Sequence, residues 1–323
     1  MSIKNMRRLI SVSLIIVLSV IFSILTDSFL STRNIFQLLK DSAYVGLIAI
    51  GLSFVIIGGG IDLSGGGIVC LVGILVARFS FVSDNIPGIV VIFFGVICGM
   101  ALGAINGFFV TKVNLSEFVT TLASGFVFSG FALIILFKEG GRLISRSLTL
   151  RSFLAFGLSF RGIYYITVVW VFIALFAYIV QSRTKFGLHV YSTGSNLKAA
   201  EMSGVNTVWI KTSGFIISGG CAGLAAAFVV AAQNATSASL GAGMEFQAIA
   251  ANVVGGVVLG GGKGDAISAL LGALFLTLLL NGIYKLGLGT PWQYMIQGIV
   301  IVVAITFDSL FNRLYQKRIL AVC

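Results

Sequence analysis

Asp62 and Ser64 lie in the stretch of sequence whose residue types offer the most chemistry. Residues 58–67 read GGGIDLSGGG, in which six glycines surround one acid and one hydroxyl. So many glycines disfavour a helix interior, and a helix break inside a membrane is tolerated where protein or a water-filled cavity satisfies the backbone. A buried acid at such a break typically faces a transport pathway or a partner. Alternatively, Asp62 caps the next helix with help from Ser64, and the two interpretations are compatible.

Other polar side chains interrupt long apolar runs. They are Asn106, Thr120, Thr121, Asn252 and Asn281. Each could hydrogen-bond a polar substrate in a central pathway, and with Asp62 and Ser64 they form the predicted translocation set. Each could equally bond a neighbouring helix, which contributes about 1 kcal/mol in a membrane.

Residue patterns typical of enzymes are missing from the sequence. The chain has one histidine, His189, and four scattered cysteines without CxxC spacing, so neither a zinc site nor a Ser-His-Asp triad is expected. A Walker motif is also missing. We therefore expect no catalytic residues, no metal ligands and no cofactor in this chain.

The composition predicts the elements that must position these residues. Hydrophobic residues make up 58% of the chain and charged residues 10%, against about 25% charged in a typical soluble domain, and the mean hydropathy is +1.09. We expect an all-α integral membrane protein, with residues 1–323 as one transmembrane domain, because apolar runs long enough to cross a bilayer follow one another. About ten spans are predicted, at 9–25, 43–60, 65–83, 86–111, 115–137, 162–181, 211–233, 246–262, 266–287 and 291–307.

Basic residues set the expected orientation, and the net charge of +11 is assigned to loops beside anionic lipid rather than to nucleic-acid binding. Ten spans place the N-terminus, the loop 182–210 and the C-terminus together on the cytoplasmic side. The same count places the loop 138–161 outside although that loop is also basic. Either the count is off by one there, or this loop serves an external purpose.

Two glycine-rich segments echo each other. Residues 47–61 read LIAIGLSFVIIGGGI and residues 248–263 read AIAANVVGGVVLGGGK, and the acids Asp62 and Asp265 follow the two glycine triplets. Paired, glycine-broken spans in two halves are the sequence pattern that points to a transporter's central site. We therefore predict an internal repeat, with chance similarity between Gly- and Val-rich segments as the rival explanation.

The loop 182–210 is polar and rich in turn formers. A short helix from Asn196 to Met202 is predicted, with Asn196 as its N-cap. A structured loop between spans indicates a surface for a partner.

Three segments resemble ribose-type ABC importer permeases. Residues 51–67 (GLSFVIIGGGIDLSGGG) resemble the family's G-G-I-D-L-S-V-G-S segment, and residues 243–264 (GMEFQAIAANVVGGVVLGGGKG) resemble its later glycine-rich segment. Residues 184–205 resemble its cytoplasmic loop. The matching loop positions include Phe186, Gly187, Tyr191, Gly194, Asn196, Ala199, Ala200, Ser203 and Gly204.

The resemblance implies the membrane subunit of a monosaccharide importer in a bacterial inner membrane. Its implied partners are a second permease copy or paralogue, cytoplasmic ATPase subunits that bind ATP and dock on loop 182–210, and a periplasmic or lipoprotein binding protein. Under this resemblance the basic external loop is expected to receive acidic residues of the binding protein through Arg142, Arg146 and Arg151. Gly65–Gly67 and Leu188 depart from the family pattern, which leaves the sugar open. The rival class is a stand-alone ion-coupled transporter that uses Asp62 as an ion relay.

Overall fold

The helices of the protein account for nearly all of its regular structure. A computed structural model describes residues 3–82, 85–138, 140, 148–303 and 306. Seven of its helices are long and apolar enough to cross a membrane. They are α1 (Ile3–Leu25), α2 (Thr32–Ile57), α4 (Gly88–Thr111), α5 (Glu117–Lys138), α8 (Tyr165–Arg183), α11 (Thr207–Gln233) and α13 (Ala266–Lys285).

The three other predicted spans correspond to shorter helices. They are α3 (Gly65–Ser80), α12 (Met244–Gly255) and a helix over 290–303, which is followed by residues outside the described part. With 16 and 12 residues, α3 and α12 are about 24 and 18 Å long, less than a bilayer core of about 30 Å. The all-helical class is thus confirmed, whereas the count of ten spans stays a prediction.

Side-chain caps explain where several helices begin. In each case an oxygen of the residue before the helix accepts a backbone N–H of the first turn, which otherwise has no partner. The caps are Ser31 for α2, Thr184 for α9 (Lys185–Ser195), Asn196 for α10 (Leu197–Met202), Asn206 for α11 and Asp265 for α13. The predicted short helix capped by Asn196 is confirmed.

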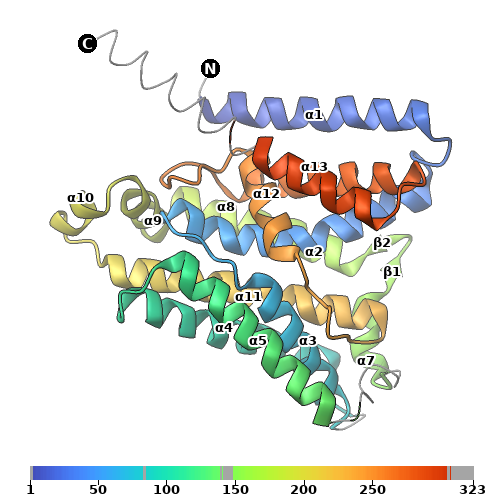
Figure 1. Ribbon diagram of the computed structural model, residues 1–323, viewed down its shortest axis with the longest axis horizontal. Coiled ribbons are helices and arrows are strands. Elements are labelled where there is room, and N and C mark those ends of the chain that lie inside the picture. The colour runs from blue at the N-terminus through green and yellow to red at the C-terminus, as the bar shows by residue number, and fades with distance from the viewer. Residues whose placement is uncertain (1–2, 83–84, 139, 141–147, 304–305, 307–323) are drawn as a thin grey trace.

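α2 and α11 form the centre of the bundle, and α4 packs on the outer side of α11 (Figure 1). Gly95, Gly99 and Gly103 on α4 face Gly219 and Gly223 on α11, so closely that an added Cβ at Gly99 would overlap the Gly219 carbonyl oxygen. Small residues at this spacing let two helix backbones approach and pack inside a membrane. We call this contact between α4 and α11 the glycine seam. It sets the position of the helices against which α3 and α5 pack.

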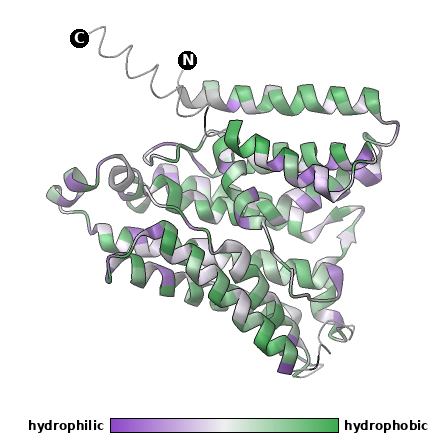
Figure 2. Ribbon diagram, viewed as in Figure 1, coloured by the Kyte–Doolittle hydropathy of each residue, from purple (hydrophilic) through white to green (hydrophobic). Residues whose placement is uncertain are grey.

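Apolar side chains also cover the outside of the bundle. Phe126 and Phe137 on α5 and Phe172 on α8 are more than 60% exposed, and apolar residues line nearly the whole length of the long helices in Figure 2. Such a surface is stable only against lipid or another apolar partner. α1 lies at the edge of the bundle against α13 (Figure 1).

The two ends of the bundle carry the remaining elements. α9 and α10 lie at one end, together with the start of α1 (Figure 1). At the other end lie α7 (Arg151–Leu154), the 3-10 turn η1 (Ala155–Gly157) and a hairpin of β1 (Ser159–Phe160) and β2 (Ile163–Tyr164). In this antiparallel hairpin Ser159 pairs with Tyr164 and Phe160 with Ile163.

Candidate transport site and coupling junction

The segment 58–64 is a non-helical connection between α2 and α3 that begins with a turn at Gly58 and Gly59. Gly59 has a φ of +85°, a backbone conformation that glycine adopts without strain, and it turns the chain out of α2. The segment is then held from α5: the Ile61 amide donates to Glu117 Oε2 at 3.1 Å and the Leu63 amide donates to Thr121 Oγ1 at 3.0 Å. The predicted break in the helix is therefore present, and protein groups satisfy its backbone.

Asp62 is buried, with 2% of its surface exposed. Its Oδ1 accepts hydrogen bonds from the Ser64 amide at 2.9 Å and the Ser64 hydroxyl at 2.6 Å, and its Oδ2 accepts from the Ser218 hydroxyl at 2.8 Å. Asn106 Nδ2 donates to Ser64 Oγ at 2.8 Å. The carboxylate thus joins the broken segment to α11 and, through Ser64, to α4.

The two sequence interpretations of Asp62 can be compared with these contacts. Ser64 is the N-cap residue of α3 but its side chain makes no capping bond, and Asp62 bonds to Ser64 itself rather than to first-turn amides. Asp62 therefore fixes the approach to α3 instead of capping it directly. Its place in the translocation pathway stays a prediction.

The predicted translocation residues separate into two groups. Asp62, Ser64, Asn106 and Thr121 belong to the cluster around the broken segment, and Thr120 lies buried beside it on α5 with no partner for its hydroxyl. The other two lie elsewhere: Asn252 Nδ2 donates to the Ala49 and Ala248 carbonyls, and Asn281 exchanges side-chain hydrogen bonds with Asn34. Those contacts are of the kind expected under the alternative in which a polar side chain bonds a neighbouring helix.

Replacing Asp62 with asparagine is expected to reduce uptake more than Asn281→Ala. The amide keeps one acceptor for Ser64 but presents an N–H₂ group to the Ser218 hydroxyl, whereas Asn281→Ala leaves Asn34 its bond to the Phe29 carbonyl. A rise of about 1.4 kcal/mol in the barrier of the transport step would make that step tenfold slower. Uptake per inserted protein checks this, and the reverse order would place the central gate away from Asp62.

A second site forms where α9 meets both glycine-rich segments. An added Cβ at Gly194, near the end of α9, would overlap the Ile57 carbonyl oxygen and lie 2.8 Å from the Gly262 amide nitrogen. The Gly262 amide itself donates to the Ile57 carbonyl at 2.8 Å. We call Ile57, Gly59, Gly194, Gly261 and Gly262 the glycine junction. The two echoing segments therefore touch here, a contact that does not test whether they arose by duplication.

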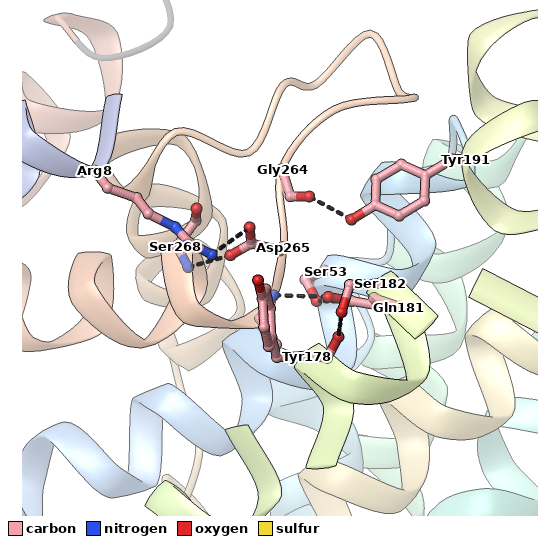
Figure 3. Close-up of polar contacts among 10 residues, drawn as sticks. Arg8, Ser53, Tyr178, Gln181, Ser182, Tyr191, Gly264, Asp265 and Ser268 are labelled. Atoms are coloured by element: carbon pink, nitrogen blue, oxygen red, sulfur yellow. Dashed lines mark hydrogen bonds and ion pairs between the residues drawn. The ribbon is translucent and has the colours of Figure 1, made fainter. Parts of the chain in front are cut away.

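Tyr191 adds a polar contact beside the glycine junction (Figure 3). Its hydroxyl donates to the Gly264 carbonyl at 2.6 Å. Burial, with the nearby Asp265 charge as the second cause, raises the pKa of Tyr191 above its ordinary value. A raised pKa favours the protonated phenol, so this donor persists throughout the physiological pH range.

Asp265 and Gln181 extend this network to α1 and α8 (Figure 3). Asp265 Oδ2 pairs with Arg8 Nη2 at 2.7 Å, and Asp265 is fully buried. Gln181 Oε1 accepts from the Ala266 amide at 2.7 Å while its Nε2 donates to Ser53 Oγ at 3.0 Å. α1, α2, α8 and α13 are thereby tied together at the end of the bundle that carries α9.

The remaining loop residues make contacts within the loop and with α2 and α8. Phe186 packs on Phe54 with ring centroids 6.2 Å apart, and Gly187 fits where a Cβ would overlap the Gln181 carbonyl. Ala199 accepts from the Ser203 hydroxyl at 2.8 Å, Ala200 is buried, and Gly204 ends the turn with a φ of +80°. Arg151 is exposed at the start of α7, whereas Arg142 and Arg146 lie outside the described residues.

Sequence reasoning did not select Ser218, Arg8, Gln181 or Lys211 as site residues. Each is a polar residue in or beside an apolar helix, and this was the only feature of the sequence that could have pointed to a role for it. The contacts that give them a role join positions far apart in the chain, such as Ser218 and Asp62.

These features define a multi-pass helical membrane protein with broken helices at its centre and a helical loop at one end, the architecture of a transport protein. Residues 34–305 match the family described as "Branched-chain amino acid transport system / permease component", and the chain belongs to this family. It is a transport subunit, and the expected resemblance to ribose-type importer permeases is confirmed.

Individual relatives are sugar permeases. The chain is 36% identical to the ribose import permease protein RbsC of Bacillus subtilis, over 90% of this chain and 89% of that protein. It is 33% identical to the D-allose transport system permease protein AlsC of Escherichia coli, over 93% of this chain and 90% of that protein. It is 28% identical to the xylose transport system permease protein XylH of the same species, over 96% of this chain and 93% of that protein. No solved structure matches the chain.

Proposed function

We propose that this chain is the membrane-spanning permease of an ATP-driven monosaccharide importer, with separate ATPase subunits docking on α9 and α10. The family match supports the transport role, and relatives named for ribose, allose and xylose support a sugar as the cargo. The termini and the loop 182–210 face the cytoplasm, and a binding protein delivers the sugar from the other side.

The observation that carries this proposal is the glycine junction. Gly194 of the docking loop lies against the Ile57 carbonyl at the end of α2, and Gly262 is bonded to the same oxygen. Movement imposed on α9 by an ATPase would therefore reach both glycine-broken segments through direct backbone contact. The Asp62 cluster lies on one of these segments, so the same movement would reshape the centre of the bundle.

Uptake into proteoliposomes tests the proposal. The chain is co-expressed with ATPase subunits encoded beside its gene and reconstituted, and the cognate binding protein is added with labelled ribose, allose or xylose. We expect uptake of at least one sugar that requires both ATP and the binding protein. Uptake driven by a proton or sodium gradient without ATP would instead establish the rival class, an ion-coupled transporter using Asp62.

A further inference from the structure

Glu117, the first residue of α5, makes two contacts with the rest of the bundle. Its Oε2 accepts the Ile61 amide of the broken segment, and its Oε1 pairs with Lys211 Nζ on α11 at 2.8 Å. Gly60 makes room for this carboxylate, because an added Cβ would lie 2.5 Å from Oε2. One side chain therefore connects three parts of the protein that are far apart in sequence.

Lys211 lies one helical turn beyond a contact with α10. Thr207, the first residue of α11, donates its hydroxyl to Glu201 Oε1 of α10 at 2.9 Å. Because i and i+4 residues share a helix face, Thr207 and Lys211 place the α10 contact and the Glu117 contact on one side of α11. A continuous line of contacts thus runs from α10 to the backbone of Ile61.

The exposure of the Glu117–Lys211 pair differs from that of the Arg8–Asp265 pair. Lys211 and Arg8 are similarly exposed, at 24% and 25%, but the carboxylates differ: the side chain of Glu117 is 19% exposed and that of Asp265 is 0% exposed. Separating Arg8 from Asp265 would leave a fully buried carboxylate without its charge partner, which is costly, whereas Glu117 and Lys211 are both accessible at the surface of the bundle, where breaking an ion pair costs less. The Glu117–Lys211 pair is therefore suited to open and close, and the Arg8–Asp265 pair to stay closed.

We propose that Glu117 and Lys211 are positioning residues that form a reversible latch on the broken segment. The closed latch couples the position of the Ile61 backbone to the position of α10. It opens once in each transport cycle, when the segment 58–64 moves. This inference rests on the proposed permease function and adds a second route to it, separate from the glycine junction.

Substitutions in the complete transporter test the latch. The permease is reconstituted with its ATPase subunits, and the ratio of ATP hydrolysis with and without sugar-loaded binding protein is measured. Lys211→Met and Glu117→Ala are expected to lower this ratio by about fivefold, the lower end of typical coupling between sites. Glu117→Gln is expected to fall between them and wild type, because its amide oxygen still accepts from Ile61. Lys112→Met, at an exposed lysine that ends α4, is the matched control and should match wild type.

Locking the pair separates a moving latch from a static brace. In Glu117→Cys/Lys211→Cys, a short bis-methanethiosulfonate cross-linker should arrest the uptake that this variant retains, and a reductant should return uptake to the level of the untreated variant. Wild type treated identically controls for the native cysteines. Full uptake in the cross-linked protein, or an unchanged hydrolysis ratio in Lys211→Met, would overturn the latch. Wild type that shows no stimulation by binding protein and no ATP-dependent uptake would instead refute the permease function itself.

Discussion

Replacing Gly194 with alanine is expected to reduce sugar uptake strongly while leaving the protein inserted in the membrane. A Cβ at this position overlaps the Ile57 carbonyl oxygen and approaches the Gly262 amide nitrogen to 2.8 Å. Neither neighbour is a flexible side chain, so α9 must move away from the two glycine-rich segments. Because α9 lies at the end of the bundle (Figure 1), this displacement separates the docking loop from the transport helices without unpacking them.

Uptake and ATP hydrolysis measured together would reveal this effect. We expect Gly194→Ala to lose at least about tenfold in sugar moved per ATP, which corresponds to about 1.4 kcal/mol of lost coupling. Gly130→Ala is the matched control, since nothing lies within 4 Å of the Cβ that it adds. Wild-type uptake per ATP in Gly194→Ala would remove the glycine junction from the coupling route.

Replacing Gly99 with valine is expected to prevent the bundle from forming. The Cβ of this residue would overlap the Gly219 carbonyl oxygen and lie 3.0 Å from the Gly223 Cα, so the whole α4–α11 seam must separate. Overpacking a tight core costs about 1–3 kcal/mol and occasionally more, and here α4 also carries Asn106 to the Asp62 cluster. The expected outcome is loss of folded protein rather than loss of coupling.

Yield and thermal unfolding in detergent measure this outcome. Gly99→Val should give little folded protein and a strongly lowered unfolding midpoint, whereas Ile97→Val, on an exposed face of the same helix, should resemble wild type. A normal midpoint in Gly99→Val would mean that α4 and α11 tolerate a wider separation. Together with Gly194→Ala, this comparison separates glycines that hold the fold from glycines that transmit movement.

Several features of the candidate site could be predicted from the sequence because they depend on neighbouring residues. The break at residues 58–64 follows from the glycine triplet 58–60, whereas the second triplet, 65–67, forms the first turn of α3; α10 begins after Asn196 because that side chain caps the next turn. The predicted spans at 65–83 and 246–262 were less accurate: the helices α3 and α12 cover 16 and 12 residues. Hydropathy does not distinguish an apolar turn that follows a helix from the helix itself, and residues 81–82 and 256–262 contain such turns.

The sequence by itself determined that this chain is helical, lies in a membrane and carries two broken segments and a structured loop. Hydrophobicity, glycine content and helix caps act over one or two turns, so they can be read along the chain. Only the tertiary structure decided that Gly194 closes on Ile57 and that Lys211 reaches Glu117, 94 residues away. Such contacts depend on how closely helix backbones approach and in what register, which is set by the packing of the whole bundle and not by any local pattern.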